Sequence, residues 1–304
     1  MFAASKTDRA SAAGATDPYF PYVPLLLETT STNGQQNNTF LDSSTNAFTI
    51  TRNGTPTQGS VTPYWPDGYW SNYFGGSGNY AITNTGGIGA TATTFTIECW
   101  IYPTATPAGV TPAVIGDMQT GNISNYISFG PTPSNLLQLF WYDGATKSAT
   151  GNTTIPLNAW THIAASVNAN AITLYVNGVL QTITGTSTLT NRTGTHGYFA
   201  LAQNLTNYYT GYISNLSVLI GTAKYSSGFT PSTTPLSASA TNQVLLTCYS
   251  NRFIDSNTAT TAKTITITGT PRVQAFQPFS PTASYTTAAY GGSGYFNGST
   301  DYLT

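Results

Sequence analysis

The sequence predicts an all-β protein whose antiparallel sheets pack as a sandwich. Between Trp160 and Gln181, apolar residues occupy every second position before and after a break at Asn168, which is the period of a strand with one buried face. Asn177-Gly178 in this stretch favours a two-residue type I′ turn, so we expect two linked hairpins. Similar runs recur between turn residues, and no segment keeps a 3.6-residue period over three turns.

Each further strand is predicted from an alternating or apolar run that ends in a turn signal. The run at 94–102 is the clearest, because Phe95, Ile97 and Cys99 share one face and Pro103 ends it. Asp143-Gly144 ends the run at 136–142. The remaining predicted strands are 23–29, 39–42, 48–52, 73–74, 79–83, 113–118, 126–129, 198–202 and 211–220.

Composition limits the functions that the chain can have. Only 6% of its 304 residues are charged, compared with about 25% in ordinary globular proteins, and the net charge is −1. Nucleic-acid binding needs clustered Lys and Arg, and a membrane span needs about 18 consecutive apolar residues. The sequence has neither, so we expect no nucleic-acid partner and no membrane insertion. The 13% aromatic content argues against disorder.

The cysteine count is two. Cys99 lies in phase with the apolar residues of its predicted strand, which indicates a buried free thiol. A Cys99–Cys248 disulfide is the alternative, and it would require an oxidising compartment.

Residues 1–22 are predicted to form an N-terminal arm. The first 17 contain no continuous apolar segment, so we expect no secretory signal there. The stretch that follows mixes aromatic residues with proline, which fixes φ and removes a backbone donor. We expect it to be extended, with Tyr19, Phe20 and Tyr22 lying against another surface or against their own domain.

An internal repeat relates the two ends of the chain. Four short motifs recur in the same order, 213 to 222 residues apart. The pairs are Pro24-Leu25-Leu26-Leu27 with Val244-Leu245-Leu246-Thr247, Phe40-Leu41-Asp42-Ser43 with Phe253-Ile254-Asp255-Ser256, Gly54-Thr55-Pro56 with Gly269-Thr270-Pro271, and Tyr73-Phe74 with Tyr295-Phe296. A repeat of this length predicts tandem domains, here 23–237 followed by a linker and an incomplete second copy at 238–304. Either the natural chain continues beyond Thr304 or another chain completes the second sheet.

Three motifs carry a resemblance to a known family. They are Phe95-Thr96-Ile97-Glu98-Cys99-Trp100-Ile101-Tyr102-Pro103, Trp160-Thr161-His162-Ile163-Ala164 and Leu174-Tyr175-Val176-Asn177-Gly178. In this order and spacing they resemble the laminin-G-like domains of the concanavalin A-like lectin/glucanase superfamily. The resemblance implies a jelly-roll sandwich of two curved antiparallel sheets over residues 23–236.

Residues 211–231 resemble, more narrowly, the closing strand of the versions found in structural proteins of tailed phages, marine ones especially. This resemblance implies a virion structural protein made in the host cytoplasm: a capsid decoration, head fibre or tail fibre on the virion surface. Its arm, including Tyr19, Phe20 and Tyr22, would bind other virion proteins, and its lectin-like modules would bind host-surface glycans. A homotrimer is expected by analogy with fibres. The alternative is a secreted, extracellular bacterial adhesin that binds carbohydrate.

The chain is not predicted to be an enzyme. Glucanases of the superfamily carry paired carboxylates on one strand, and neither Glu28 nor Glu98 has an acidic neighbour two or four positions away. Glu98 is expected on a sheet face in a hydrogen-bonding role, and His162 in a structural position. No cofactor is predicted. Calcium at Asp117 and Asn125 is the weaker alternative. Calcium needs six to eight oxygen ligands, usually with several carboxylates, and the whole chain has only ten acidic residues.

Carbohydrate binding is the function that the residue types allow. Sugars bind to aromatic faces beside amide and hydroxyl groups, and the chain has five Trp and 20 Tyr. Two platforms are predicted, Trp141-Tyr142-Asp143 at a strand end and Asn207-Tyr208-Tyr209 in a loop. The alternative for the tryptophans is packing in the core or on a sheet face.

Overall fold

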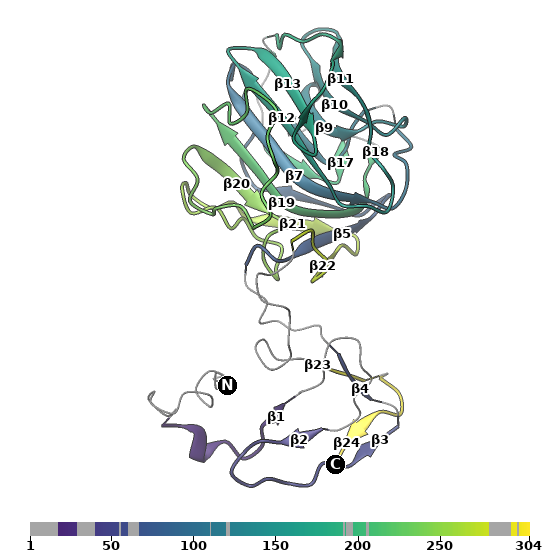
Figure 1. Ribbon diagram of the computed structural model, residues 1–304, viewed down its shortest axis with the longest axis vertical. Coiled ribbons are helices and arrows are strands. Elements are labelled where there is room, and N and C mark those ends of the chain that lie inside the picture. The colour runs from purple at the N-terminus through teal and green to yellow at the C-terminus, as the bar shows by residue number, and fades with distance from the viewer. Residues whose placement is uncertain are drawn as a thin grey trace. The chain divides into compact units, whose positions relative to one another are not determined.

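The described residues of the chain form antiparallel β-strands and one three-residue 3₁₀ helix, so the predicted all-β class is confirmed (Figure 1). The computed structural model describes residues 18–28, 40–54, 56–59, 67–109, 111–119, 122–190, 192, 197–204, 207–279, 293–296 and 298–304. The chain divides into two compact units, 66–280 and the pair of segments 1–65 and 281–304. Across the described ranges, no helix is long and apolar enough to cross a membrane.

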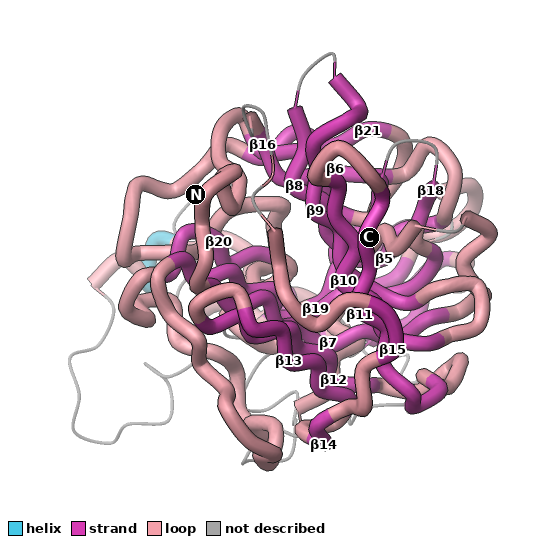
Figure 2. Tube along the Cα trace, turned by 90° about the horizontal axis from the view of Figure 1, so that it is seen from above, coloured by secondary structure: helices cyan, strands magenta, loops and turns pink. Residues whose placement is uncertain are grey.

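Residues 66–280 form a sandwich of two eight-stranded sheets, seen from above in Figure 2. The first, the β7 sheet, has the order β14 (Val179–Leu180), β13 (Ala171–Val176), β12 (Thr161–Asn168), β7 (Phe95–Pro103), β19 (Thr210–Ile220), β5 (Ser71–Gly75), β22 (Arg272–Gln274), and β20 (Gln243–Thr247) also pairs with β19. The second, the β10 sheet, has the order β15 (Thr184–Gly185), β11 (Thr146–Thr154), β10 (Leu136–Tyr142), β9 (Asn122–Pro131), β8 (Ile115–Gln119), β16 (Tyr198–Leu201), β6 (Tyr80–Thr83), β21 (Ile265–Thr268).

The core lies between the two sheets, because alternate side chains of each strand point inward. On β7 the inward residues are Phe95, Ile97, Cys99 and Ile101, and all four are buried. The β10 sheet contributes buried side chains from β6, β8, β9, β10, β11 and β16: Ala81, Ile115, Ile127, Phe129, Leu137, Leu139, Trp141, Ala149, Phe199 and Leu201. Burying each large aliphatic side chain stabilises the fold by about 1.5–3 kcal/mol.

Both cysteines are buried free thiols, as expected from the phase of Cys99. Burial raises the pKa of Cys99 and of Cys248 above the ordinary thiol value, and the neighbouring Cys248 and Glu98 raise that of Cys99 further. Neither thiol is therefore reactive in the folded chain.

The two predicted hairpins are present. β12 pairs with β13 through a turn at Ala169 and Asn170, whose φ values of 46° and 72° are both positive. β13 pairs with β14 through Asn177 and Gly178, with φ values of 48° and 76°, as a type I′ turn requires. A Cβ on Gly178 would lie 1.8 Å from the carbonyl oxygen of Phe229, so only glycine allows residues 222–236 to pass this close.

The predicted domain boundary at residue 237 is wrong. β20, β21 and β22 lie beyond it and pair with β19, β6 and β5 of the sandwich. Leu245 and Leu246 are completely buried there. The physical reason is that these three strands cover sheet edges that would otherwise present unpaired backbone groups.

The described part of the second unit contains three short antiparallel strand pairs. β1 (Leu27–Glu28) pairs with β2 (Leu41–Asp42), β3 (Arg52–Asn53) with β24 (Tyr302–Leu303), and β4 (Thr57–Gly59) with β23 (Ser293–Tyr295). The predicted strands at 23–29 and 48–52 are therefore shorter than expected.

The predicted arm lies only partly within the described residues, because residues 1–17 are outside them. Phe20–Tyr22 forms a 3₁₀ helix, which corrects the expected extended conformation. Pro21, at the start of this helix, lacks the N–H that a helix leaves unused there, so proline favours the turn. Tyr19 and Tyr22 are 73% and 81% exposed.

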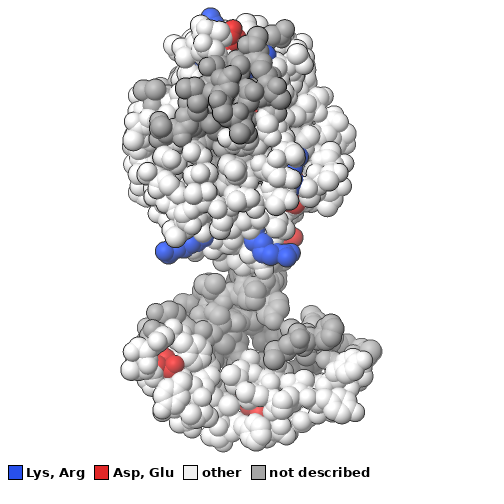
Figure 3. All heavy atoms as spheres, turned by 180° about the vertical axis from the view of Figure 1, so that it is seen from behind, with Lys and Arg blue, Asp and Glu red and all other residues white. Residues whose placement is uncertain are grey.

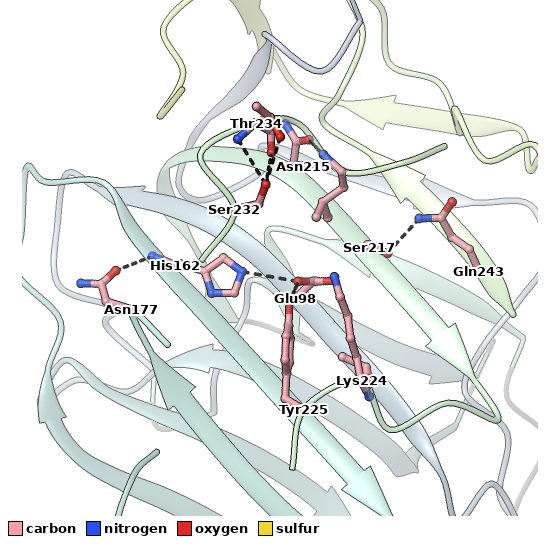
Figure 4. A network of polar contacts seen from close by, with 12 residues as sticks. Glu98, His162, Asn177, Asn215, Ser217, Lys224, Tyr225, Ser232, Thr234 and Gln243 are labelled. Atoms are coloured by element: carbon pink, nitrogen blue, oxygen red, sulfur yellow. Dashed lines mark hydrogen bonds and ion pairs between the residues drawn. The ribbon is translucent and has the colours of Figure 1, made fainter. Parts of the chain in front are cut away.

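A buried ionic cluster holds residues 222–236 on the outer face of the β7 sheet (Figure 4). The Glu98 carboxylate is 1% exposed and lies 2.5 Å from the Lys224 ammonium and 3.5 Å from Nε2 of His162. The Tyr225 hydroxyl donates at 2.6 Å to Oε2 of Glu98, the oxygen that also faces His162, whereas Lys224 contacts Oε1. Phe229 then stacks on Tyr225, with ring centroids 3.6 Å apart. Glu98 therefore has the hydrogen-bonding role predicted for it.

The cluster keeps Glu98 ionised. Burial alone would raise the pKa of Glu98, but the contact with His162 and the charge of Lys224 outweigh it and lower the pKa to about 2. Burial, followed by the charge of Glu98, raises the pKa of Tyr225. A carboxylate that is buried and ion-paired in this way has no access to a substrate, so it acts in structure.

We expect Glu98→Gln to destabilise the sandwich by about 1–3 kcal/mol at pH 7, because Lys224 loses its counter-ion. The pKa of Glu98 is lowered in the folded state, so its contribution is present above the ordinary value of 4.5 and is lost as the pH falls toward 2. Urea unfolding followed by tryptophan fluorescence at pH 7 and pH 3 measures both effects.

Asp67→Asn removes an exposed carboxylate and is the matched control. It should unfold like the wild type at both pH values. A Glu98→Gln variant that also did so would contradict a stabilising role for the cluster.

Candidate functional site

The first predicted sugar platform is not available at the surface. Trp141 is completely buried, and its Nε1–H donates to the Thr190 hydroxyl at 2.9 Å. That hydroxyl in turn donates to the Asp143 carboxylate, and this bond holds the pKa of Asp143 below its usual value. Tyr142 alone keeps a half-buried ring. The prediction for Trp141 is therefore wrong: the residue belongs to the core, in phase with Leu137 and Leu139.

The second predicted platform is also only partly accessible. β17 (Gln203–Asn204) and β18 (Asn207–Tyr208) form a short hairpin, and the Asn207 amide donates to Thr111. Tyr209 is 1% exposed, so its predicted role in sugar binding is wrong. Tyr208 is half-buried, with its ring 6.4 Å from that of Tyr80.

The residues considered for calcium do not form a site within the described chain. Asp117 is 1% exposed, and its Oδ2 accepts the N–H of Ile88 at 2.7 Å. Arg192 lies nearby; burial lowers the pKa of its guanidinium to about 10, and the charge of Asp117 opposes that shift. Asn125 lies in β9, and its side chain is outside the described atoms. No cluster of three or more metal-ligating side chains occurs among the residues that the structure describes.

An aromatic row, defined here as Trp160, Tyr102, Tyr212, Tyr73 and Phe276, crosses the outer face of the β7 sheet. Tyr212 pairs directly with Tyr102 of β7 on one side and Tyr73 of β5 on the other. Trp160 precedes Thr161, which pairs with Ile101, and so extends the row across β12. The register of four strands places these rings side by side.

The rings contact one another continuously. Centroid distances are 5.6 Å from Tyr102 to Trp160, 5.8 Å from Tyr102 to Tyr212, and 4.8 Å from Tyr212 to Tyr73. Phe276 lies over the middle of the row, 4.9 Å from Tyr102, 4.9 Å from Tyr212 and 5.2 Å from Trp160. These spacings fall in the range of favourable aromatic pairs.

Backbone contacts fix Phe276 in this position. The Ser71 hydroxyl donates to the Phe276 carbonyl, and Ser71 pairs with Gln274 where β5 meets β22. Phe279, three residues further on, is 4% exposed and packs on Trp100 with centroids 6.0 Å apart. The segment that carries Phe276 is thus attached to the sheet at both ends.

The aromatic row is the part of this sheet face that stays open. Its four sheet residues are half-buried and Phe276 is 43% exposed, whereas His162 and Ser214, in the next row, are nearly or completely buried. Charged side chains are few and scattered on the face shown in Figure 3, in keeping with the 6% charge content. A rigid, uncharged aromatic surface can stack on the apolar face of a sugar ring and offer tyrosine hydroxyls to its edge.

Sequence reasoning missed this row, although its signal was available. Tyr102, like Trp100, lies in the outward phase of the clearest predicted strand, and Trp160 is in phase with His162. Tyr73 and Phe276 could not be assigned to the same surface without knowing how β5 and β22 pair.

A family model described as the concanavalin A-like lectin/glucanases superfamily matches residues 74–221. Among solved structures, a putative carbohydrate-binding protein from Bacteroides ovatus shares 14% identity, with 66% of this chain and 60% of that chain covered and a TM-score of 0.45. A pentraxin from Limulus polyphemus shares 14% identity, with 53% and 78% covered and a TM-score of 0.38.

Domains LG4–5 of the mouse laminin α1 chain share 14% identity, with 54% of this chain and 47% of that chain covered and a TM-score of 0.38. No curated protein matches the chain. The match to the family model covers β6 to β19, the strands that carry the three sequence motifs and the core of both sheets. Residues 74–221 are therefore similar to the domains of the concanavalin A-like lectin/glucanases superfamily.

Proposed function

We propose that the sandwich is a non-catalytic carbohydrate-binding module and that the aromatic row is its binding surface. The observation that carries the proposal is the continuous contact of five partly exposed aromatic side chains: three from β5, β7 and β19, Trp160 just before β12, and Phe276 after β22. Half-exposed rings in a row are costly to leave in water and give a stacking surface without requiring charge. The name of the family whose model matches residues 74–221 includes lectins, which supports a carbohydrate ligand.

The absence of catalysis in this proposal has its own support. Glu98, for which the sequence predicts a hydrogen-bonding role and no catalytic one, is buried beneath residues 222–236 and paired with Lys224. A retaining hydrolase needs a second carboxylate about 5 Å away. The side chains in contact with Glu98 are His162, Lys224 and Tyr225, and none is a carboxylate.

We expect Phe276→Ala and Tyr212→Ala each to weaken binding of a glycan selected on a glycan array by about tenfold, which corresponds to about 1.4 kcal/mol for the loss of one stacking ring. Titration of the selected glycan, followed by tryptophan fluorescence, measures the loss. The emission of Trp160 should also change on binding, because this ring belongs to the row.

The matched control is Tyr142→Ala, which removes a half-buried ring from the β10 sheet. Loss of binding in this variant with unchanged binding in the two row variants would move the site to the opposite sheet. Glycan binding as tight as that of the wild type in all three variants would overturn the proposed surface.

We also propose that the module works on the surface of a tailed-phage particle, as a capsid decoration or fibre. The resemblance of residues 211–231 to the closing strand of phage structural proteins supports this setting, and so does the nearly uncharged composition. In this setting, the arm with Tyr19, Phe20 and Tyr22 binds another virion protein, the modules bind host glycans, and the chains trimerise. The competing setting is a secreted bacterial adhesin.

Particles that lack the gene product should lose one discrete projection in cryo-electron microscopy, while the shell and tail stay intact. Density that is unchanged everywhere would exclude the virion setting. It would leave the aromatic row untouched, because sugar binding is measured on the purified chain.

A further inference from the structure

Two segments of the chain share one local architecture. We call residues 244–274, which cover edges of the sandwich, the C-terminal closing segment, and residues 24–59 the N-terminal closing segment. In the first, the Asp255 carboxylate accepts the backbone N–H groups of Leu246, Asn257 and Lys263, at 3.0, 3.1 and 2.9 Å. These three bonds fix the path of the segment between β20 and β21.

The N-terminal closing segment repeats this arrangement. The Asp42 carboxylate accepts the backbone N–H groups of Leu26, Ser44 and Phe48, at 2.9, 2.8 and 2.9 Å. The carbonyl of Leu26 accepts the N–H of Ser43 at 2.7 Å, as the carbonyl of Leu246 accepts that of Ser256 at 2.7 Å. Desolvation of the Asp42 carboxylate would raise its pKa, but these hydrogen bonds outweigh that effect and lower the pKa to about 2.

The strand registers are the same as well. In the sandwich, Ile267 pairs with Ala81 and Thr268 with Tyr80, and in the other unit, Arg52 pairs with Leu303 and Asn53 with Tyr302. An offset of 215 residues relates β21 and β22 to their counterparts in the N-terminal closing segment, an offset of 222 relates the partner strands, and together they convert one set of pairs into the other.

The next strand pair follows the same rule. Arg272 pairs with Tyr73 in the sandwich, and Thr57 pairs with Tyr295 in the other unit, which are again the positions that the two offsets relate. A strand register that slipped by one residue would exchange the two faces of the strand. The agreement of both pairs therefore shows that the two closing segments bind their partner strands in one mode.

The two copies differ in burial. Leu245 and Thr247 are completely buried where β20 pairs with β19, whereas their counterparts Leu25 and Leu27 are 47% and 42% exposed. The N-terminal closing segment thus exposes to solvent positions whose counterparts in the C-terminal closing segment are buried in the sandwich.

We infer that the N-terminal closing segment can take the place of the C-terminal one on β19, β5 and β6 of the sandwich, so that two segments of this chain compete for one docking surface. The surface fits both, because leucine at 25 and 26, phenylalanine at 40 and isoleucine at 50 repeat Leu245, Leu246, Phe253 and Ile265.

One position decides which segment is preferred. Cys248 is completely buried in the core, and the residue at its position in the N-terminal copy is Glu28. A carboxylate placed there would lose its hydration without a partner, which is costly. The C-terminal closing segment therefore holds the surface, and the N-terminal one is the minor occupant.

Cysteine cross-linking of the full chain tests this inference. Thr266 pairs with Ile82 in the sandwich, and Thr51 is the counterpart of Thr266. Ile82→Cys with Thr266→Cys reports the C-terminal closing segment, and Ile82→Cys with Thr51→Cys reports the N-terminal one, after treatment with a short bis-maleimide. Cys99 and Cys248 are buried and should not react.

Asp255→Ala removes three hydrogen bonds from the C-terminal segment and should raise the Thr51–Ile82 product at least about fivefold. Asp42→Ala, the matched control, should abolish that product, and Glu28→Ala should increase it. A product within one chain or between two copies has the same occupant and supports the inference; its mobility on a denaturing gel separates the two.

Absence of the Thr51–Ile82 product in every background, while the Thr266–Ile82 product forms, would overturn the inference. So would loss of cooperative unfolding in Asp255→Ala, because the N-terminal segment would then have failed to replace its rival. Cross-linking and unfolding need no glycan, so their outcome is independent of the function of the aromatic row.

Discussion

The alternation of side chains along β7 is the constraint on which the rest of the sandwich depends. β7 is paired on both sides, with β12 and β19, so its register is fixed along its whole length. Phe95, Ile97, Cys99 and Ile101 therefore all face the core. Glu98, Trp100 and Tyr102 must then face outward, and each of them organises a different part of the outer surface.

The outward residues of β7 act through different forces. Glu98 is an acid under a covering segment, and its burial is tolerated only because Lys224, Tyr225 and His162 satisfy it. Tyr102 carries no charge, and its contacts with Trp160, Tyr212 and Phe276 need no desolvation of an ion. The covered end of the sheet therefore holds the charge, and the open end holds the aromatic row. A binding surface at the open end can accept a neutral ligand without disturbing the ion pair.

The sequence allowed the sandwich, its hairpins and most long strands to be predicted, because these depend on a period of two. β11 was missed for the same reason: Thr146–Thr154 contains one alanine among hydroxyl, amide, glycine and lysine residues, and so shows no apolar period. Trp141 was predicted at the surface because tryptophan is a common sugar-binding residue. Its phase with Leu137 and Leu139, which indicates the core, is the better guide to its position. The aromatic row required the order of four strands, and no local pattern encodes the order of strands in a sheet.

The repeat shows most clearly what sequence reasoning cannot decide. Both closing segments carry the same apolar positions and the same central aspartate, so either is compatible with the sandwich edges by pattern alone. Their order along the chain favoured a boundary at residue 237, but strand pairing follows free energy. The contrast between Cys248 and Glu28 supplies that difference: a neutral thiol enters the core at little cost, and an unpaired carboxylate does not. One buried position can thus determine which of two nearly equivalent segments closes the fold.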